Sequence, residues 1–243
     1  MKKIYLTIDD SPSGNMKEKV DFLAEKKIPA IFFCIGEKME RYPEKVIDAI
    51  QNGFAIGNHS YSHPHFSNLS IEEIKTEILK TEKILDTLFA QAGKKRIKYF
   101  RFPFGDKGDG LKGQMPSFWR RSNLSRKSEI QDFLRKQGFV SPPMLEDNYL
   151  FYEKMNAHQD MDWHWTFDTI DYSDTMSDDE ILSRIAKGNP KNPLVRKIRE
   201  DYWLGAKRKT EIILVHDYDY KHQLFFKIIN QLQQLPLSFQ EIT

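Results

Sequence analysis

The apolar positions of the chain fall into short strand-like runs that alternate with longer stretches of helical spacing. Residues 4, 6 and 8 are apolar and alternate with Tyr5 and Thr7, which predicts a strand that ends at Asp9-Asp10. Ala30–Ile35 is a continuous apolar run followed by a glycine, the pattern of a strand buried on both faces. The same signals predict strands over residues 54–57, 99–102, 139–140, 163–167, 211–215 and 238–242.

Helices are predicted between these strands from apolar spacing and from their end signals. Ser70-Ile71-Glu72-Glu73 and Ser177-Asp178-Asp179-Glu180 are capping boxes, while Pro43 suits a first helical position and Gly53 a helix end. The predicted helices cover residues 16–24, 43–50, 71–88, 130–137, 178 onward and 223–235. Because strands alternate with helices, we expect an α/β fold whose parallel sheet is closed, or nearly closed, into a barrel.

Composition narrows the class of protein. A chain of 243 residues with 40% hydrophobic and 30% charged residues suits one large globular domain, 1–243. Insertions near 106–121 and 188–209 are expected at the rim of its barrel. The net charge of +2 gives no reason to expect a nucleic-acid partner. Cys34 is the single cysteine, which excludes a disulfide framework and a multi-cysteine metal site. No signal core or membrane span is seen, so we expect a cytoplasmic protein.

Charged and imidazole side chains follow several of the predicted strands. In parallel α/β barrels the loops after the strands share one face, so these side chains are expected to meet in one basin. Three of the seven histidines lie within residues 59–65, and two of them, four residues apart, can meet one ion on a helical turn. The eight residues expected in the basin are Asp9, Asp10, His59, His63, Arg101, Asp168, Asp171 and His216.

A carboxylate and two imidazoles would hold zinc or a similar divalent ion with one position open for water. Such an ion makes water more acidic and polarises a bound carbonyl group. A second carboxylate can then accept the proton of the water, and a histidine opposite can protonate the leaving group. This combination predicts hydrolysis of an amide or an ester.

Five sequence elements then resemble, in chain order, the motifs of the polysaccharide deacetylases, the NodB-homology carbohydrate esterases of family 4. The first three, which are specific together, are Thr7–Pro12, His59–His63 and Arg101–Gly105. The last two, Trp165–Tyr172 and Leu214–His216, are short. The resemblance spans nearly the whole chain and implies a distorted (β/α) barrel, which we expect to have seven strands. It also implies metal-dependent removal of N-acetyl groups from a carbohydrate.

Carried over position by position, the resemblance implies a role for each site residue. Asp10, His59 and His63 would hold the divalent metal, which we expect to be zinc, with cobalt or nickel as alternatives. Asp9 would be the general base and Arg101 would orient it, while His216 would be the general acid, tuned by Asp171. The backbone N–H of Phe104 would stabilise the oxyanion. Trp165 and Tyr172 are expected to contact the sugar substrate.

Three residues depart from the family pattern: Ser11 replaces a glycine, Phe104 a tyrosine, and Tyr172 a tryptophan that often walls the acetyl pocket. The last change leaves the size of the acyl group open. For the aromatic run, packing in the core is the alternative to sugar stacking at Trp163 and Trp165, and Trp119 is a further candidate. Two other functions stay open: another C–N hydrolase, such as a deformylase or a ureide hydrolase, and a glycan-binding protein without activity. The sequence leaves the oligomeric state open.

Overall fold

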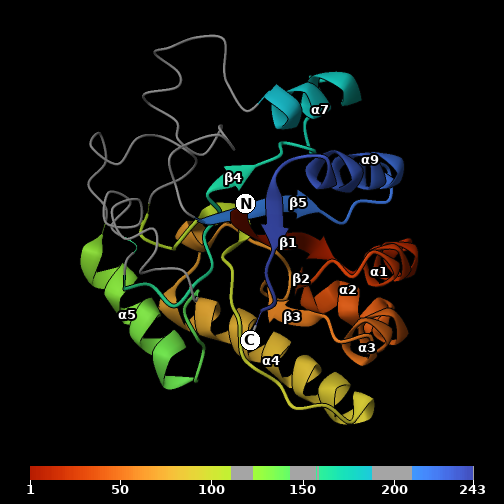
Figure 1. Cartoon of the computed structure of the whole chain (residues 1–243). Helices are drawn as coiled ribbons and strands as arrows, with labels where there is room; N and C mark the ends of the chain where they lie inside the picture. Colours follow the sequence, from red (N-terminus) through yellow and green to blue (C-terminus); the bar gives the residue numbers. More distant parts are fainter. Residues whose placement is uncertain (111–122, 143–156, 158, 188–209, 243) are drawn as a thin grey trace.

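The computed structural model describes residues 1–110, 123–142, 157, 159–187 and 210–242. Within these residues a central parallel sheet is surrounded by helices (Figure 1). Its strands are β1 (Lys2–Ser11), β2 (Ala30–Cys34), β3 (Ala55–Asn58), β4 (Phe167–Asp168), β5 (Thr210–His216) and β6 (Leu237–Phe239). The helices are α1 (Met16–Glu25), α2 (Gly36–Arg41), α3 (Pro43–Gln51), α4 (Ile71–Ala92), α5 (Leu124–Lys136), α7 (Asp178–Lys187) and α9 (His222–Gln233), with 3-10 turns η1 (Phe66–Asn68) and η2 (Pro103–Gly105).

The sheet has the order β3-β2-β1-β5-β4, and β6 pairs with the start of β1. All these pairs are parallel, as the alternation of strands and helices predicted. In the described residues six strands form, where we expected seven, and continuous pairing does not close the barrel. The gap between β3 and β4 is bridged by single contacts, such as the hydrogen bond that the backbone N–H of Trp163 donates to the carbonyl of Phe100 at 2.8 Å. The result is a distorted, incompletely closed barrel.

The strands predicted at 99–102 and 139–140 are wrong as continuous strands. Each is present only as an isolated bridge, Asn58 with Phe100 and Lys98 with Phe139. Proline offers no N–H to a ladder, so Pro103 prevents the first of these segments from extending its pairing.

The helix ends follow the signals in the sequence, with two exceptions. The Ser70 capping box forms, and Pro43 occupies the first turn of α3. The helix expected from residue 130 instead begins at Leu124, because the Asn123 side chain caps it by accepting from the N–H of Arg126. The short helix α2 was not predicted.

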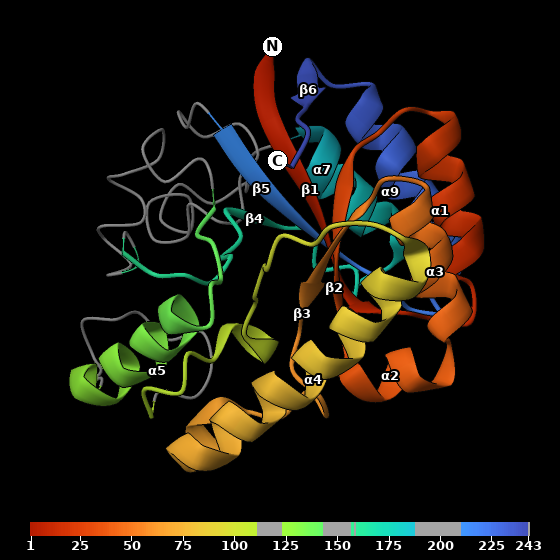
Figure 2. The ribbon, with the colours of Figure 1, turned by 90° about the horizontal axis from the view of Figure 1, so that it is seen from below.

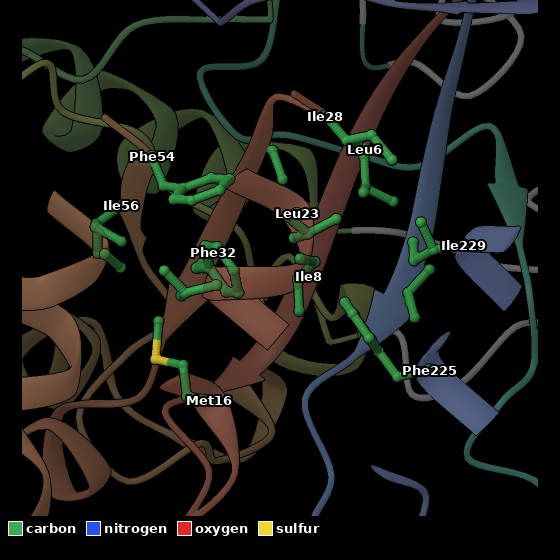
Figure 3. Close-up of a cluster of buried hydrophobic side chains, with 14 of the residues drawn as sticks. Leu6, Ile8, Met16, Leu23, Ile28, Phe32, Phe54, Ile56, Phe225 and Ile229 are labelled. Carbon is green, nitrogen blue, oxygen red and sulfur yellow. The ribbon is translucent and has the colours of Figure 1, made fainter. Parts of the chain in front are cut away.

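The sheet has two faces with different contents. The outer face carries Ile4, Leu6 and Ile8 of β1, which belong to the larger core cluster together with residues of α1, α3, α4, α7 and α9. Figure 2 shows α1, α3 and α9 on this side of the sheet. Figure 3 shows part of this cluster, in which side chains of β1 and β2 meet those of α1 and α9. The inner face, which is the barrel interior, holds a second cluster built on Ile31, Phe33, Tyr99, Trp163, Ile212 and Leu214.

Two expectations about the whole chain are only partly covered by the described residues. Of the rim insertions, residues 106–110 are described, whereas 111–122 and 188–209 lie outside the described residues, as does Trp119. Among the described helices, none combines the length and the apolar character that crossing a bilayer requires. The cytoplasmic location stays a prediction.

Candidate active site

The residues expected in one basin follow the carboxyl ends of neighbouring strands. Asp9 and Asp10 lie at the end of β1, His59 directly after β3, Asp168 at the end of β4 and His216 at the end of β5. Because these strands are parallel, their carboxyl ends share one edge of the sheet. The described structure therefore brings together residues that are far apart in the sequence.

Asp9 and Asp10 both enter this basin because β1 is irregular at its end. In a regular strand, consecutive side chains point to opposite faces, so the two carboxylates would be separated by the sheet. The pairing of β1 with β2 shifts register between Ile8 and Ser11, and Asp10 has a φ of 62°. The left-handed backbone at Asp10 turns its side chain to the same side as that of Asp9. The two carboxylates are 3% and 7% exposed, respectively.

Asp10, His59 and His63 form the cluster that could hold a metal ion. One ligand atom of each residue lies within 4.8 Å of the others. Asp10 Oδ1 is 3.1 Å from His63 Nε2 and 3.5 Å from His59 Nε2. Burial alone would raise the pKa of Asp10, but the two imidazoles hold that pKa well below its usual range. Burial lowers the pKa of His63, which favours the neutral, ligating form.

The hydrogen bonds around the cluster fit a bound cation. His59 Nδ1 lies 2.8 Å from the carbonyl oxygen of Arg101, and a carbonyl oxygen can only accept, so the proton is on Nδ1. In the neutral ring, the form that binds a metal, the Nε2 lone pair of His59 therefore faces Asp10 Oδ1, a buried oxygen with no hydrogen-bond donor among the described residues. Two acceptors that face each other are stabilised by a cation between them. Orientation of a ligating histidine through its other nitrogen is the usual arrangement at metal sites.

The two histidines meet in a loop and not on a helical turn, which corrects the expectation from their spacing. Residues 59–63 form no helix, and Ser60 and His63 have φ values of 65° and 57°. The loop is held to α4 because Glu77 accepts from the N–H groups of Tyr61 and Ser62 at 2.9 and 2.8 Å.

Arg101 is buried beneath Asp9. It is 1% exposed, and its Nη1 donates to Asp9 Oδ1 at 2.7 Å and to Thr7 Oγ1 at 2.7 Å. Its Nε donates to the carbonyl of Trp163 at 2.8 Å, and its guanidinium lies 4.4 Å from the ring centroid of Phe33. These contacts fix the guanidinium, which in turn fixes the orientation of the Asp9 carboxylate.

His216 is paired with Asp171. Its Nδ1 is 2.8 Å from Asp171 Oδ1, and its backbone N–H donates to Asp171 Oδ2 at 2.9 Å. Burial alone would lower the pKa of His216, but the Asp171 carboxylate raises it to about 9, so the imidazole is protonated near neutrality. Asp168 is buried beside this pair, accepts from the N–H of Ile170 at 2.8 Å, and has a pKa raised by burial to about 6.

The aromatic candidates divide between the site and the interior. Phe104 is 53% exposed, and its ring centroid lies 4.5 Å from that of His63. Tyr172 packs edge-on against His216 at 5.2 Å. Trp163 is fully buried in the inner core, and Trp165 is 8% exposed. The Trp165 ring lies so close to Gly105, whose φ is 63°, that a Cβ there would come within 2.9 Å of it.

Residues that sequence reasoning missed also border the site. The hydroxyl of Tyr218 donates to Asp10 Oδ2 at 2.7 Å, and Lys19, which is 0% exposed, forms an ion pair with Asp217. The sequence contains a signal for each of these two residues. Tyr218 lies two residues after the strand-end histidine, and Lys19 occupies an inward position between Met16 and Leu23 at helical spacing.

Comparison with known proteins places this site in context. A family model described as polysaccharide deacetylase matches residues 1–117, which include the first three motifs. The peptidoglycan-N-acetylglucosamine deacetylase of Bacillus cereus is 36% identical over 105 residues, 43% of this chain and 37% of that protein. The chitooligosaccharide deacetylase of Azorhizobium caulinodans is 33% identical over 103 residues, 42% of this chain and 48% of that protein. The chain therefore spans less than half the length of these curated relatives.

Solved structures share the fold. A family 4 carbohydrate esterase from Streptomyces lividans matches with a TM-score of 0.60 and 20% identity, covering 100% of this chain and 93% of that one. The catalytic domain of a peptidoglycan N-acetylglucosamine deacetylase from Eubacterium rectale matches with a TM-score of 0.64 and 17% identity, covering 100% and 89%. At these identities the likeness concerns the fold, and it confirms the distorted α/β barrel that the motifs implied.

Proposed function

We propose, from the relation of this chain to the polysaccharide deacetylases, that it is a metal-dependent hydrolase that removes N-acetyl groups from a carbohydrate. The substrate class is an N-acetylated sugar, oligosaccharide or glycoconjugate. The observation that carries the proposal is the grouping of Asp10, His59 and His63 beside the Asp9–Arg101 pair, on the sheet edge that also carries His216. The family model and the named relatives support the same chemistry.

Asp10, His59 and His63 would hold a divalent metal, and we propose zinc, with cobalt or nickel as alternatives. Bound there, the ion would act as a Lewis acid on the acetamide carbonyl and make water a better nucleophile at neutral pH. The single tautomer that the Arg101 carbonyl imposes on His59 supports this assignment, because it leaves the ring lone pair directed at the site.

The remaining groups supply proton transfer. Asp9, oriented by its ion pair with Arg101, accepts a proton from the attacking water. His216, kept protonated by Asp171, donates a proton to the departing sugar amine, so that acetate and a free amine are released. The N–H of Phe104 would stabilise the oxyanion of the tetrahedral intermediate. Tyr172 and Trp165 would form the wall around the acetyl group and the sugar ring. We propose that residues 1–243 form one catalytic domain, with rim insertions near 106–121 and 188–209.

The test is release of acetate from N-acetylated glucosamine oligomers, abolished by a chelator and restored by zinc or cobalt. His63→Ala should lose the metal, whereas Asp9→Asn should retain the metal and lose turnover, because it removes the base without removing a ligand. His222→Ala is the matched control, since this histidine contacts Glu18 at 3.0 Å and is not a member of the cluster. Full activity in both site variants would refute the assignment.

The same assay separates the alternative functions. A deformylase would release formate from the corresponding N-formyl substrate and leave acetamides intact. A glycan-binding protein without activity would bind the oligomers and release no acid. Release of acetate with a rate that depends on Asp9 supports the deacetylase.

A further inference from the structure

Tyr218 lies between the proposed metal site and the proposed general acid. Its hydroxyl donates to Asp10 Oδ2 at 2.7 Å. Its ring lies flat against the imidazole of His216, with the ring centroids 5.1 Å apart and the planes 4° from parallel. A single side chain therefore contacts both halves of the site, which are otherwise carried by separate strands.

The loop that carries Tyr218 is fixed by buried polar contacts. Asp217 accepts from the backbone N–H and the hydroxyl of Ser13 at 2.8 and 2.7 Å, and it is 0% exposed. The Lys19 ammonium, also 0% exposed, pairs with Asp217 and donates to the carbonyl of Tyr218 at 3.1 Å. The N–H of Asp217 donates to the carbonyl of Asp9 at 2.9 Å. These bonds tie the loop after β5 to the loop after β1.

This arrangement leaves the Asp10 carboxylate one orientation. Oδ2 is occupied by the Tyr218 hydroxyl, and Oδ1 faces the Nε2 atoms of His59 and His63 without a hydrogen-bond donor of its own. We propose that Tyr218 is a positioning residue that directs Asp10 Oδ1 alone toward the metal and holds the His216 ring in place. This inference rests on the proposed function of the site.

The hydroxyl and the ring have separable effects. The hydroxyl acts on Asp10, so its loss frees the carboxylate to rotate and weakens metal binding. The ring acts on His216, because a flat aromatic neighbour on one side and the edge of Tyr172 on the other restrict rotation of the imidazole. Loss of the ring therefore lowers the rate of proton donation even when the metal site is saturated.

Zinc titration of the chelator-treated protein tests the hydroxyl. Tyr218→Phe should raise the dissociation constant for zinc by about 10-fold, the usual size of an effect from a group that orients a metal ligand. Tyr220→Phe is the matched control, since this ring stacks on Tyr218 but is 65% exposed and should leave zinc affinity unchanged. Wild-type affinity in Tyr218→Phe overturns the inference. His63→Ala separates the two proposals: if it retains wild-type zinc affinity, the metal site itself is refuted.

Steady-state kinetics at saturating zinc test the ring. Tyr218→Phe should then retain kcat. Tyr218→Leu should lower kcat by at least about tenfold with little change in KM, because the His216 imidazole is no longer held in the orientation that proton donation requires. The melting temperature of each zinc-free variant is measured alongside to separate this effect from loss of folding. If Tyr218→Leu folds and retains kcat, the ring has no positioning role.

Discussion

Replacement of Asp171 by asparagine should remove the charge that keeps His216 protonated. Asp171 contacts the imidazole Nδ1 and the backbone N–H of His216 at 2.8 and 2.9 Å, and Thr169 donates to the same carboxylate at 2.9 Å. An asparagine can keep much of this geometry without the negative charge. The variant therefore isolates the electrostatic contribution of the pair from its packing.

The size of the effect follows from the pKa of His216, which is about 9 against an ordinary 6.5. This difference corresponds to about 3 kcal/mol in favour of the protonated ring. Burial opposes this, and Asp9 and Asp10 add less than Asp171 does. In Asp171→Asn burial remains, so the pKa of His216 should fall to 6.5 or below.

Two measurements report this pKa. The alkaline limb of the pH profile of kcat/KM should lie near pH 9 in the wild type and at least about 2 pH units lower in Asp171→Asn. Nitrogen chemical shifts of the imidazole, followed by NMR across the same pH range, should give the same midpoints. Agreement between the two assigns the kinetic limb to His216.

The pH dependence of folding stability should reflect the same raised pKa of His216. A histidine whose pKa is raised on folding stabilises the fold fully below about pH 6.5 and loses that contribution as the pH rises through about 9. The wild type should therefore become less stable across this window, and Asp171→Asn should not. Asp174→Asn, the same change at an exposed position of the same loop, is the control. An unchanged alkaline limb in Asp171→Asn would refute the role given to this pair.

Three further substitutions test other parts of the structure. Arg101→Lys keeps the charge but not the planar set of donors that holds Asp9, so kcat should fall by about 10²–10⁴-fold in steady-state assays; a wild-type kcat would contradict the orienting role. Lys19→Met leaves the Asp217 carboxylate buried without its cation and should lower the free energy of unfolding in urea by about 3–5 kcal/mol, whereas a loss under about 1 kcal/mol would show that water replaces the ammonium. Ser70→Ala removes the cap of α4 and should cost about 1 kcal/mol in the same urea assay with no change in kcat.

Several helices and strands could be predicted because the signals for them are local. The apolar alternation before Asp9, the capping box at Ser70 and the proline at position 43 each depend on a few neighbouring residues, and each forms as expected. The strand expected at 99–102 failed because pairing is a property of two segments, and Pro103 limits how far one of them can pair. The start of α5 at Leu124 was missed because its cap, Asn123, precedes the apolar residues that were used to detect the helix.

The grouping of the site residues could be predicted, but their geometry could not. Strand ends bring Asp10, His59 and His63 to one edge, and the structure places one ligand atom of each within 4.8 Å of the others. Period-two alternation, however, would have placed Asp9 and Asp10 on opposite faces. The positive φ of Asp10 that resolves this conflict depends on the register shift between β1 and β2, which no local pattern reveals. Tyr218 was missed although the same rule about strand ends applies to it.

The buried ion pairs beneath the site are better explained by the geometry that they impose than by a gain in stability. The Lys19–Asp217 and Arg101–Asp9 pairs are at most 5% exposed, and each joins segments that are far apart in the sequence. Apolar residues of similar size commonly give equal or greater stability at such sites, because desolvation offsets most of the attraction between buried charges. An apolar pair, however, cannot hold a carboxylate in one orientation. Each charged pair fixes the orientation of a carboxylate or of a loop that borders the Asp10–His59–His63 cluster. We therefore expect buried ion pairs in this barrel where the geometry of the site depends on them.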